Sequence, residues 1–280
     1  MDKLLIVDGM NLHFQMFFGM PARIKNKAGV GIWGTLGFVG ALLKIIKQTK
    51  PTHVAVIFDG EGSLERKQTD ENYKANRPNY STAPEDENPF TQLNDVYNAL
   101  NYLNIKHCES CGCETDDIIA GYAQTYGKDM QIVISSYDSD FFQLINENVQ
   151  IFRYRGDKSV ICDSEYINEK FNISPNVYAD FKSLTGDNAD NIKGATKVGP
   201  KTASLLINKF GSLQNLLENA EKIEKVNLRE TIINEKEKLK NNYKIIKLQN
   251  NCQLPFDINE LKYSLKEGVT TNLVLKEIGL

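Results

Sequence analysis

Three short runs of apolar residues in the first half of the chain each lead to an aspartate. The runs cover residues 3–7, 54–58 and 131–135, and they are continuous rather than alternating. A continuous apolar run of this length is typical of a strand buried on both faces of a parallel sheet. Two shorter runs, at 149–152 and 159–162, are predicted to complete the sheet.

Segments with helical spacing separate these runs. Between residues 91 and 103, apolar residues stand at Leu93, Val96, Leu100 and Leu103, which places them on one face of a helix. Strands that alternate with helices predict an α/β fold with a mainly parallel sheet flanked by helices.

In the C-terminal third the alternation stops and helical patterns dominate. Residues 176–184 predict one helix, and a second is expected to start at Pro200 and to end before Gly211. The stretch 221–247, rich in Glu and Lys, predicts one long exposed helix. We therefore divide the chain into an α/β core and a helical region, covering residues 1–174 and 175–280.

Composition places the chain among globular proteins. It has 280 residues, of which 41% are hydrophobic, and a net charge of -3. That charge argues against a uniformly basic nucleic-acid binder but leaves room for local basic patches. The longest apolar stretch, residues 33–46, is shorter than a membrane span, and the amino terminus lacks the layout of a signal peptide. We therefore expect a cytoplasmic protein that binds no membrane.

Five cysteines leave two interpretations open. Cys108, Cys111 and Cys113 crowd together beside His107, which would suit zinc. A second, distant pair of ligands is missing, and this favours reduced structural thiols.

Acidic residues gather at the predicted carboxyl ends of the strands, the edge where open parallel sheets build their sites. They are expected to meet the acid-rich helix start at residues 114–117, although acids also favour a helix start through the macrodipole alone. The whole set is better explained by metal ions, because ionised carboxylates this close repel one another unless a cation lies among them. The set consists of Asp8, Asp59, Glu114, Asp116, Asp117, Asp138 and Asp140.

A glycine-rich segment, residues 194–203, has the chemistry to bind phosphate. Gly199 and Pro200 suit a turn into a helix whose free amide groups face an anion. No acidic residue occurs from 191 to 217, and this favours binding to nucleic-acid phosphates that does not depend on base sequence. An ordinary helical hairpin with solvated lysines is the alternative. The lysines are Lys193, Lys197, Lys201 and Lys209.

Seven short motifs follow one another along the chain: Val7-Asp8-Gly9, Phe58-Asp59-Gly60, Tyr73-Lys74-Ala75-Asn76-Arg77-Pro78, Gly112-Cys113-Glu114-Thr115-Asp116-Asp117, Asp138-Ser139-Asp140, Gly186-Asp187-Asn188-Ala189-Asp190-Asn191 and Val198-Gly199-Pro200-Lys201-Thr202-Ala203. Together they resemble the bacterial 5′-nuclease or flap-endonuclease family, whose members are free-standing or attached to family-A DNA polymerases. The resemblance covers nearly the whole chain. It implies a PIN-like core, a helical arch formed by the polar insertion at about residues 62–90, and a helix-three-turn-helix motif that binds duplex DNA.

The resemblance also implies roles for individual residues. Lys74 and Arg77 would neutralise charge at the scissile phosphate. Tyr73 would stack on an unpaired base, with packing of the arch as the alternative. Two or more Mg²⁺ or Mn²⁺ ions would be held by nine carboxylates, which are the seven named above together with Asp187 and Asp190. The hairpin would bind K⁺ and meet the duplex backbone through Lys197, Gly199, Lys201 and Thr202.

Four positions depart from the usual pattern of the family. Gln15 stands where arginine is common, Tyr137 precedes Asp138 where glycine is usual, and Cys113 and Thr115 flank Glu114. None of these departures removes a carboxylate, so we expect them to affect rate and substrate preference more than the chemistry.

We therefore predict a metal-dependent, structure-selective 5′-nuclease that acts as a monomer on DNA with 5′ ends, flaps or nicks. Two other interpretations share part of the pattern. A non-catalytic DNA-junction binding module would gain nothing from the acids, and a PIN-type RNase would not need the glycine hairpin or the carboxylates at Asp187 and Asp190.

Overall fold

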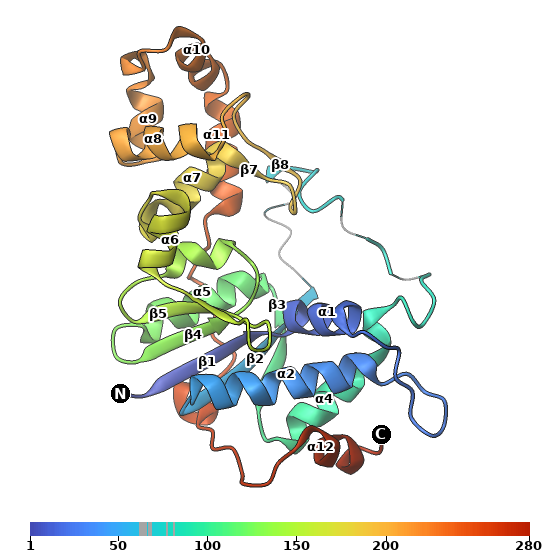
Figure 1. The fold of residues 1–280 in the computed structure, drawn as a ribbon. Helices are drawn as coiled ribbons and strands as arrows, with labels where there is room; N and C mark the ends of the chain where they lie inside the picture. Colours follow the sequence, from blue (N-terminus) through green and yellow to red (C-terminus); the bar gives the residue numbers. More distant parts are fainter. Residues whose placement is uncertain (62–65, 67–68, 77, 81) are drawn as a thin grey trace.

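The computed structural model describes residues 1–61, 66, 69–76, 78–80 and 82–280 (Figure 1). Its centre is a six-stranded sheet in the order β3-β2-β1-β4-β5-β6. All neighbouring strands are parallel except β5 and β6, so the predicted mainly parallel sheet is confirmed. The strands are β1 (Lys3–Asp8), β2 (His53–Glu61), β3 (Lys106–Cys111), β4 (Gln131–Ser135), β5 (Val149–Arg153) and β6 (Val160–Cys162).

Helices cover both faces of the sheet. Leu5 and Val7 belong to the hydrophobic cluster that includes α2 and α4, whereas Leu4 and Ile6 belong to the cluster that includes α5. All four side chains are fully buried, which explains why β1 reads as a continuous apolar run. The helices of the core are α1 (Gly9–Gly19), α2 (Trp33–Thr49), α4 (Leu93–Tyr102) and α5 (Thr115–Tyr126).

The helical region stands on one end of the core (Figure 1). Its elements are α6 (Ser164–Phe171), α7 (Tyr178–Thr185), β7 (Gly186–Asp187), β8 (Ile192–Lys193), α8 (Pro200–Phe210), α9 (Leu213–Glu218), α10 (Val226–Asn234) and α11 (Lys236–Ile246), and 3₁₀ turns lie at Pro89–Gln92, Asp140–Leu144, Pro175–Val177, Ala220–Lys222 and Ile258–Leu261. As predicted, α8 begins at Pro200 and ends before Gly211, which adopts a positive φ of 81°. Gly186 and Gly194 allow β7 and β8 to approach, since a Cβ on Gly194 would lie 2.3 Å from the Thr185 carbonyl carbon.

The prediction of one long exposed helix over residues 221–247 is wrong. The structure breaks this stretch into α10 and α11, and Ile232, Leu239 and Ile245 are buried. The many Glu and Lys residues in this stretch obscure the spacing of these three apolar residues. In the structure they lie on the inward-facing sides of two separate helices.

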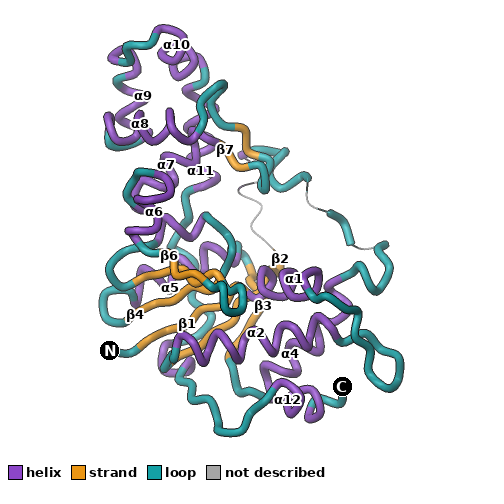
Figure 2. Tube along the Cα trace, in the orientation of Figure 1, coloured by secondary structure: helices purple, strands orange, loops and turns teal. Residues whose placement is uncertain are grey.

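The polar insertion joins the core to the helical region. Arg66 and Thr69 are helical, and residues 71–76 form turns. The Lys74 backbone N–H donates to the Asp190 carbonyl at 3.1 Å, and the Asn76 amide donates to the Asn188 carbonyl at 3.0 Å. Figure 2 shows a described part of the insertion lying beside β7. These contacts place Tyr73 and Lys74 between the two halves of the molecule.

A C-terminal strap, residues 247–270, returns from α11 across the core to α12 (Thr271–Glu277), which packs against α2 and α4. A disulfide joins Cys113 to Cys252 in this strap, so the prediction of reduced thiols is wrong for Cys113. The sequence does not show this pairing because 139 residues separate the two cysteines. Cys108 and Cys111 are free thiols, and none of the described residues completes a zinc site with them. Within the described part of the chain, no helix is long and apolar enough to cross a bilayer.

Candidate active site

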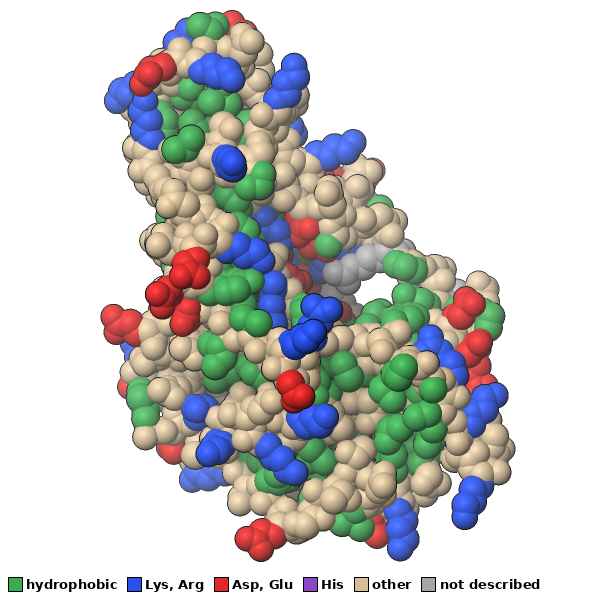
Figure 3. Space-filling view, in the orientation of Figure 1, with side chains coloured by type: hydrophobic (Ala, Val, Ile, Leu, Met, Phe, Trp, Pro, Cys, Tyr) green, Lys and Arg blue, Asp and Glu red, His purple; other side chains and the backbone are tan. Residues whose placement is uncertain are grey.

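A cavity of about 1380 Å³ opens at the carboxyl ends of β1, β2 and β4. Figure 3 shows acidic and basic side chains next to one another where the surface is hollowed below the helical region. Five of the predicted carboxylates line the cavity: Asp8, Asp59, Glu114, Asp116 and Asp138. They come from three strand ends and one helix start, as the sequence pattern predicts for an open parallel sheet.

Asp8 is held rigidly at the floor of this cavity. It caps α1, where its carboxylate accepts from the Asn11 backbone N–H at 3.1 Å, and it also accepts from the Ser136 hydroxyl at 2.8 Å. Burial raises the pKa of Asp8 to about 7, and the negative charge of Asp59 raises it further. The two hydrogen bonds lower the pKa but do not outweigh these effects.

The pKa of Asp116 is raised for the same reasons. Burial raises its pKa well above the usual range, and the charges of Asp138 and Asp8 add to it. Carboxylates that repel one another at close range in a buried setting have the chemistry of a site for divalent cations with hard oxygen ligands. The residues present therefore fit a divalent metal ion.

Two cations hold the start of α5. Arg66 forms ion pairs with Glu114 and with Asp117, the latter at 2.7 Å, and Lys74 lies 3.0 Å from Glu114. Burial would raise the pKa of Glu114, but the charges of Lys74 and Arg66 outweigh it and lower the pKa. Asp117 also accepts from the Gln249 backbone N–H at 2.9 Å and does not line the cavity.

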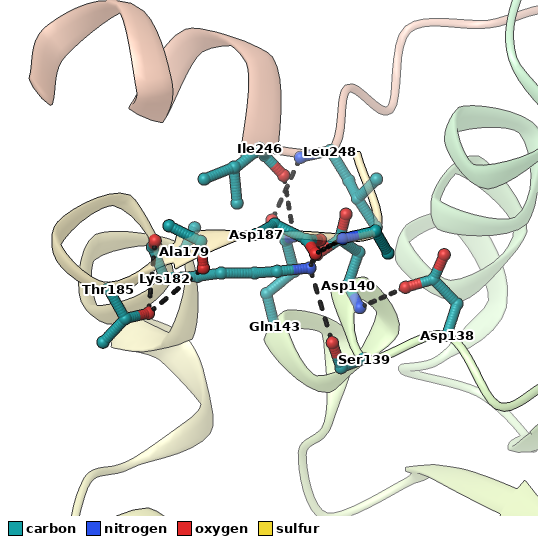
Figure 4. Close-up of polar contacts among 12 residues, drawn as sticks. Asp138, Ser139, Asp140, Gln143, Ala179, Lys182, Thr185, Asp187, Ile246 and Leu248 are labelled. Carbon is teal, nitrogen blue, oxygen red and sulfur yellow. Dashed lines mark hydrogen bonds and ion pairs between the residues drawn. The ribbon is translucent and has the colours of Figure 1, made fainter. Parts of the chain in front are cut away.

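A second acidic cluster lies between the core and α7. Asp140, Asp187 and Asp190 bring carboxylate oxygens within 4.8 Å of one another. Figure 4 shows Lys182 reaching from α7 toward Asp140 and Asp187. Its ammonium pairs with Asp140 and lies 2.6 Å from Asp187. Burial would lower the pKa of Lys182, but the charges of Asp140, Asp138 and Asp187 outweigh it and raise the pKa.

Family models match both halves of the chain. The N-terminal resolvase-like domain of 5′-3′ exonucleases matches residues 3–172, and the C-terminal SAM fold of the same family matches residues 173–268. The chain belongs to the 5′-3′ exonuclease family. The family that the sequence motifs resemble is thereby confirmed, as is the fold class.

Curated relatives in this family differ greatly in length. A 5′-3′ exonuclease of Aquifex aeolicus is 32% identical over 290 residues, which cover 99% of this chain and 96% of the relative. DNA polymerase I of Rhizobium leguminosarum is 33% identical over 275 residues, but the chain spans about a quarter (26%) of that protein. A solved structure of the bacteriophage T5 flap endonuclease with DNA and metal ions has a TM-score of 0.73 at 22% identity, covering 87% of this chain and 88% of that one. This structural similarity shows that the two proteins share a fold.

The remaining predicted residues lie in three places. Tyr73 is buried against Ala179 and Ile192, and its hydroxyl donates to Glu114 at 3.2 Å, while base stacking by Tyr73 stays a prediction. Arg77 lies outside the described residues. The predicted DNA-binding residues of the hairpin lie on the helical region rather than in the cavity: Lys197, Gly199, Lys201 and Thr202.

Two charged residues of this family member were not predicted as part of the site. Arg66 stands among several basic residues of the polar insertion, and nothing in its spacing singles it out. Lys182 had a usable signal, because it lies in α7 among the buried residues Ala179, Phe181 and Leu184. A lysine amid buried positions needs an acidic partner.

Proposed function

We propose that this exonuclease-family protein is a metal-dependent, structure-selective 5′-nuclease. It hydrolyses DNA phosphodiesters as a 5′-3′ exonuclease and as a 5′-flap endonuclease, in replication or repair. The observation that carries the proposal is the cavity at the strand ends, where Asp8, Asp59, Asp116 and Asp138 meet. A pure binding module would gain nothing from acids that repel both one another and DNA.

Two groups of carboxylates would hold the divalent ions. Glu114 and the four aspartates of the cavity would hold one ion, with Glu114 and Asp116 as its closest ligands, and Asp117 would orient water or reach toward the second ion. The second ion would lie among Asp140, Asp187 and Asp190. Bound there, Mg²⁺ or Mn²⁺ supplies a water of lowered pKa and offsets charge on the leaving oxygen.

The chain's own cations would act on the phosphate. Lys74 lines the cavity with its ammonium beside Glu114, so a small movement brings its charge to a phosphate bound over the acids. Arg77 would assist from the same insertion. Both would offset charge that grows in the transition state.

Strand recognition would fall to other walls of the cavity and to the hairpin. Phe14, Tyr80 and Phe90 line the cavity with ring centroids 5.7 to 6.0 Å apart, which suits stacking by unpaired bases. On the helical region, four hairpin residues would meet the duplex backbone and a K⁺ ion: Lys197, Gly199, Lys201 and Thr202.

We further propose the organisation in which this activity operates. Residues 1–174 form the nuclease core with its arch, and residues 175–280 form the helix-three-turn-helix region. The protein works as a monomer in the cytoplasm, at the nucleoid. These points are supported by the two family models, which meet between residues 172 and 173, and by the bacterial relatives.

The direct test is cleavage of a 5′-flap duplex by the purified protein with Mg²⁺ or Mn²⁺. Asp116→Asn and Asp138→Asn are expected to abolish cleavage, because each removes one carboxylate that would hold a divalent ion. DNA binding should stay within about threefold. Asp129→Asn, an exposed acid away from the cavity, is the matched control. Full turnover by both cavity variants would show that the site is elsewhere.

The same assay separates the two alternatives. A DNA-junction binding module would retain affinity across a titration of Mg²⁺ without any cleavage. A PIN-type RNase would cut a flap made of RNA and leave the matching DNA flap intact. Cleavage of the DNA flap that depends on the metal excludes both.

A further inference from the structure

The β5–β6 turn, residues 154–159, brings an unpaired cation to the cavity. Arg155 lines the cavity together with Asp8, Asp138 and Lys74. Lys74 is paired with Glu114. Within the described part of the chain, the guanidinium of Arg155 has neither a hydrogen bond nor an ion pair, and its side chain is exposed. Arg155 is therefore free to take an anionic ligand.

The turn that carries Arg155 is held rigidly from within. The Arg155 backbone N–H donates to the Ser159 hydroxyl at 2.9 Å, and that hydroxyl donates to the Gly156 carbonyl at 2.6 Å. The Lys158 N–H donates to the Arg155 carbonyl at 3.1 Å. Gly156 supplies the positive φ of 59° that this tight turn requires.

Two side chains of the cavity wall fix the turn from outside. Gln15 of α1 donates its amide N–H to the Tyr154 carbonyl at 2.8 Å, and the Tyr137 hydroxyl donates to the same oxygen at 3.0 Å. Both residues line the cavity. At the end of β5, the Arg153 guanidinium donates to the Tyr137 carbonyl at 2.9 Å and lies 4.5 Å from the Phe142 ring centroid. The turn is thus tied to the loop that carries Asp138.

We propose that Arg155 binds a backbone phosphate of the DNA strand in the cavity, and that Gln15 and Tyr137 position it. The proposal rests on the function proposed above. A guanidinium matches the geometry of a phosphate and keeps its charge at any working pH. The five carboxylates of the cavity repel such a strand, and the charge of Lys74 is already engaged by Glu114, so Arg155 supplies a further positive charge for the phosphate. The proposal also explains two departures from the family pattern, because Gln15 and Tyr137 would both position Arg155.

Steady-state cleavage of a 5′-flap DNA duplex at saturating Mg²⁺ tests this inference. Arg155→Gln is expected to raise KM about tenfold, which is the lower end of the range for one hydrogen-bonded contact to a charged group, with kcat within about twofold. The slope of log KM against log salt should fall by about one. Arg155→Lys should recover most of the loss. The matched control is Lys158→Gln, which removes one charge from the same turn but lies outside the cavity lining, and it should behave as wild type.

Gln15→Ala separates positioning from direct contact. If Gln15 acts through the turn, Gln15→Ala raises KM in the wild type but adds nothing in the Arg155→Gln background. Equal effects in both backgrounds would overturn the positioning role. Thermal unfolding of each variant confirms that the fold is intact.

The outcomes separate this inference from the proposed function. If wild type cuts the flap and Arg155→Gln matches both wild type and Lys158→Gln in KM and salt slope, Arg155 is not a phosphate contact. If wild type cuts nothing, the proposed function fails. Arg155 is then judged by the affinity of the same DNA in EDTA, where equal binding by Arg155→Gln and Lys158→Gln would overturn the inference.

Discussion

The ammonium of Lys182 lies 2.6 Å from the carboxylate of Asp187, and both side chains are largely buried. The same ammonium pairs with Asp140, so one lysine compensates two acids in the second acidic cluster. This pairing provides charge compensation of the kind that a divalent ion in the cluster would also supply. A metal ion that enters this cluster therefore meets a positive charge already in place.

Lys182→Met is expected to lower the free energy of unfolding of the metal-free protein by about 3–5 kcal/mol, because it leaves buried acids unpaired. Mg²⁺ or Mn²⁺ should restore more stability to this variant than to the wild type. Thermal unfolding in EDTA and in excess metal measures both effects. Lys238→Met, which removes a half-exposed partner of Glu235, is the matched control and should cost at most about 1 kcal/mol. Equal losses in the two variants would contradict the prediction.

The raised pKa of Asp8 leads us to expect an unusual dependence of stability on pH. Its pKa is raised to about 7 in the folded protein, whereas an unfolded aspartate titrates near 3.8. The folded state thus binds this proton more tightly, so the free energy of unfolding contributed by Asp8 decreases as pH rises from about 4 to about 7.

Asp8→Asn should remove that decrease, and in EDTA at pH 8 it should raise the unfolding temperature by a few degrees. Saturating Mg²⁺ should then stabilise the wild type more than the variant. Asp163→Asn is the control, because Asp163 also caps a helix, at the Tyr166 backbone N–H, but lies away from the cavity. An unfolding temperature that rises with pH through this range equally in wild type and Asp8→Asn would exclude the interpretation.

Lys74 is expected to act on the chemical step. Lys74→Met should lower kcat by about 10²-fold, the scale on which removal of one group that stabilises transition-state charge acts, while KM changes little. Single-turnover cleavage of a flap substrate measures the step directly. Lys170→Met offers a matched control. The Lys170 ammonium lies 5.2 Å from the Tyr166 ring centroid, much as the Lys74 ammonium lies 4.8 Å from the Tyr73 ring centroid, but Lys170 does not line the cavity. A change confined to KM would indicate a binding role instead.

The disulfide between Cys113 and Cys252 is expected to stabilise the folded protein. It closes a loop across 139 residues and fastens the C-terminal strap beside Glu114. Cys252→Ser should lower the free energy of unfolding by about 2–5 kcal/mol under oxidising conditions. A reductant should bring the wild type to the same value and leave the variant unchanged. Cys111→Ser, which removes a free exposed thiol, should have no effect in either condition.

Much of the core was predictable because its determinants are local. Continuous apolar runs predicted β1, β2 and β4, and the acids at their ends predicted the edge of the sheet where the cavity lies. Pro200 and Gly211 predicted the limits of α8. Each of these signals lies within a few residues of the element that it specifies.

Other features depend on groups that are distant in the sequence. The chain by itself determined the strands, the acidic edge and the family, since periodicity, end residues and motifs are written in consecutive positions. Only the tertiary structure decided that Arg66 and Lys182 neutralise the acids, that Cys113 meets Cys252, and that Gln15 holds the turn of Arg155. Ion pairs, a disulfide and a hydrogen bond act over a few ångströms, and which residues come that close is settled by packing of the whole chain.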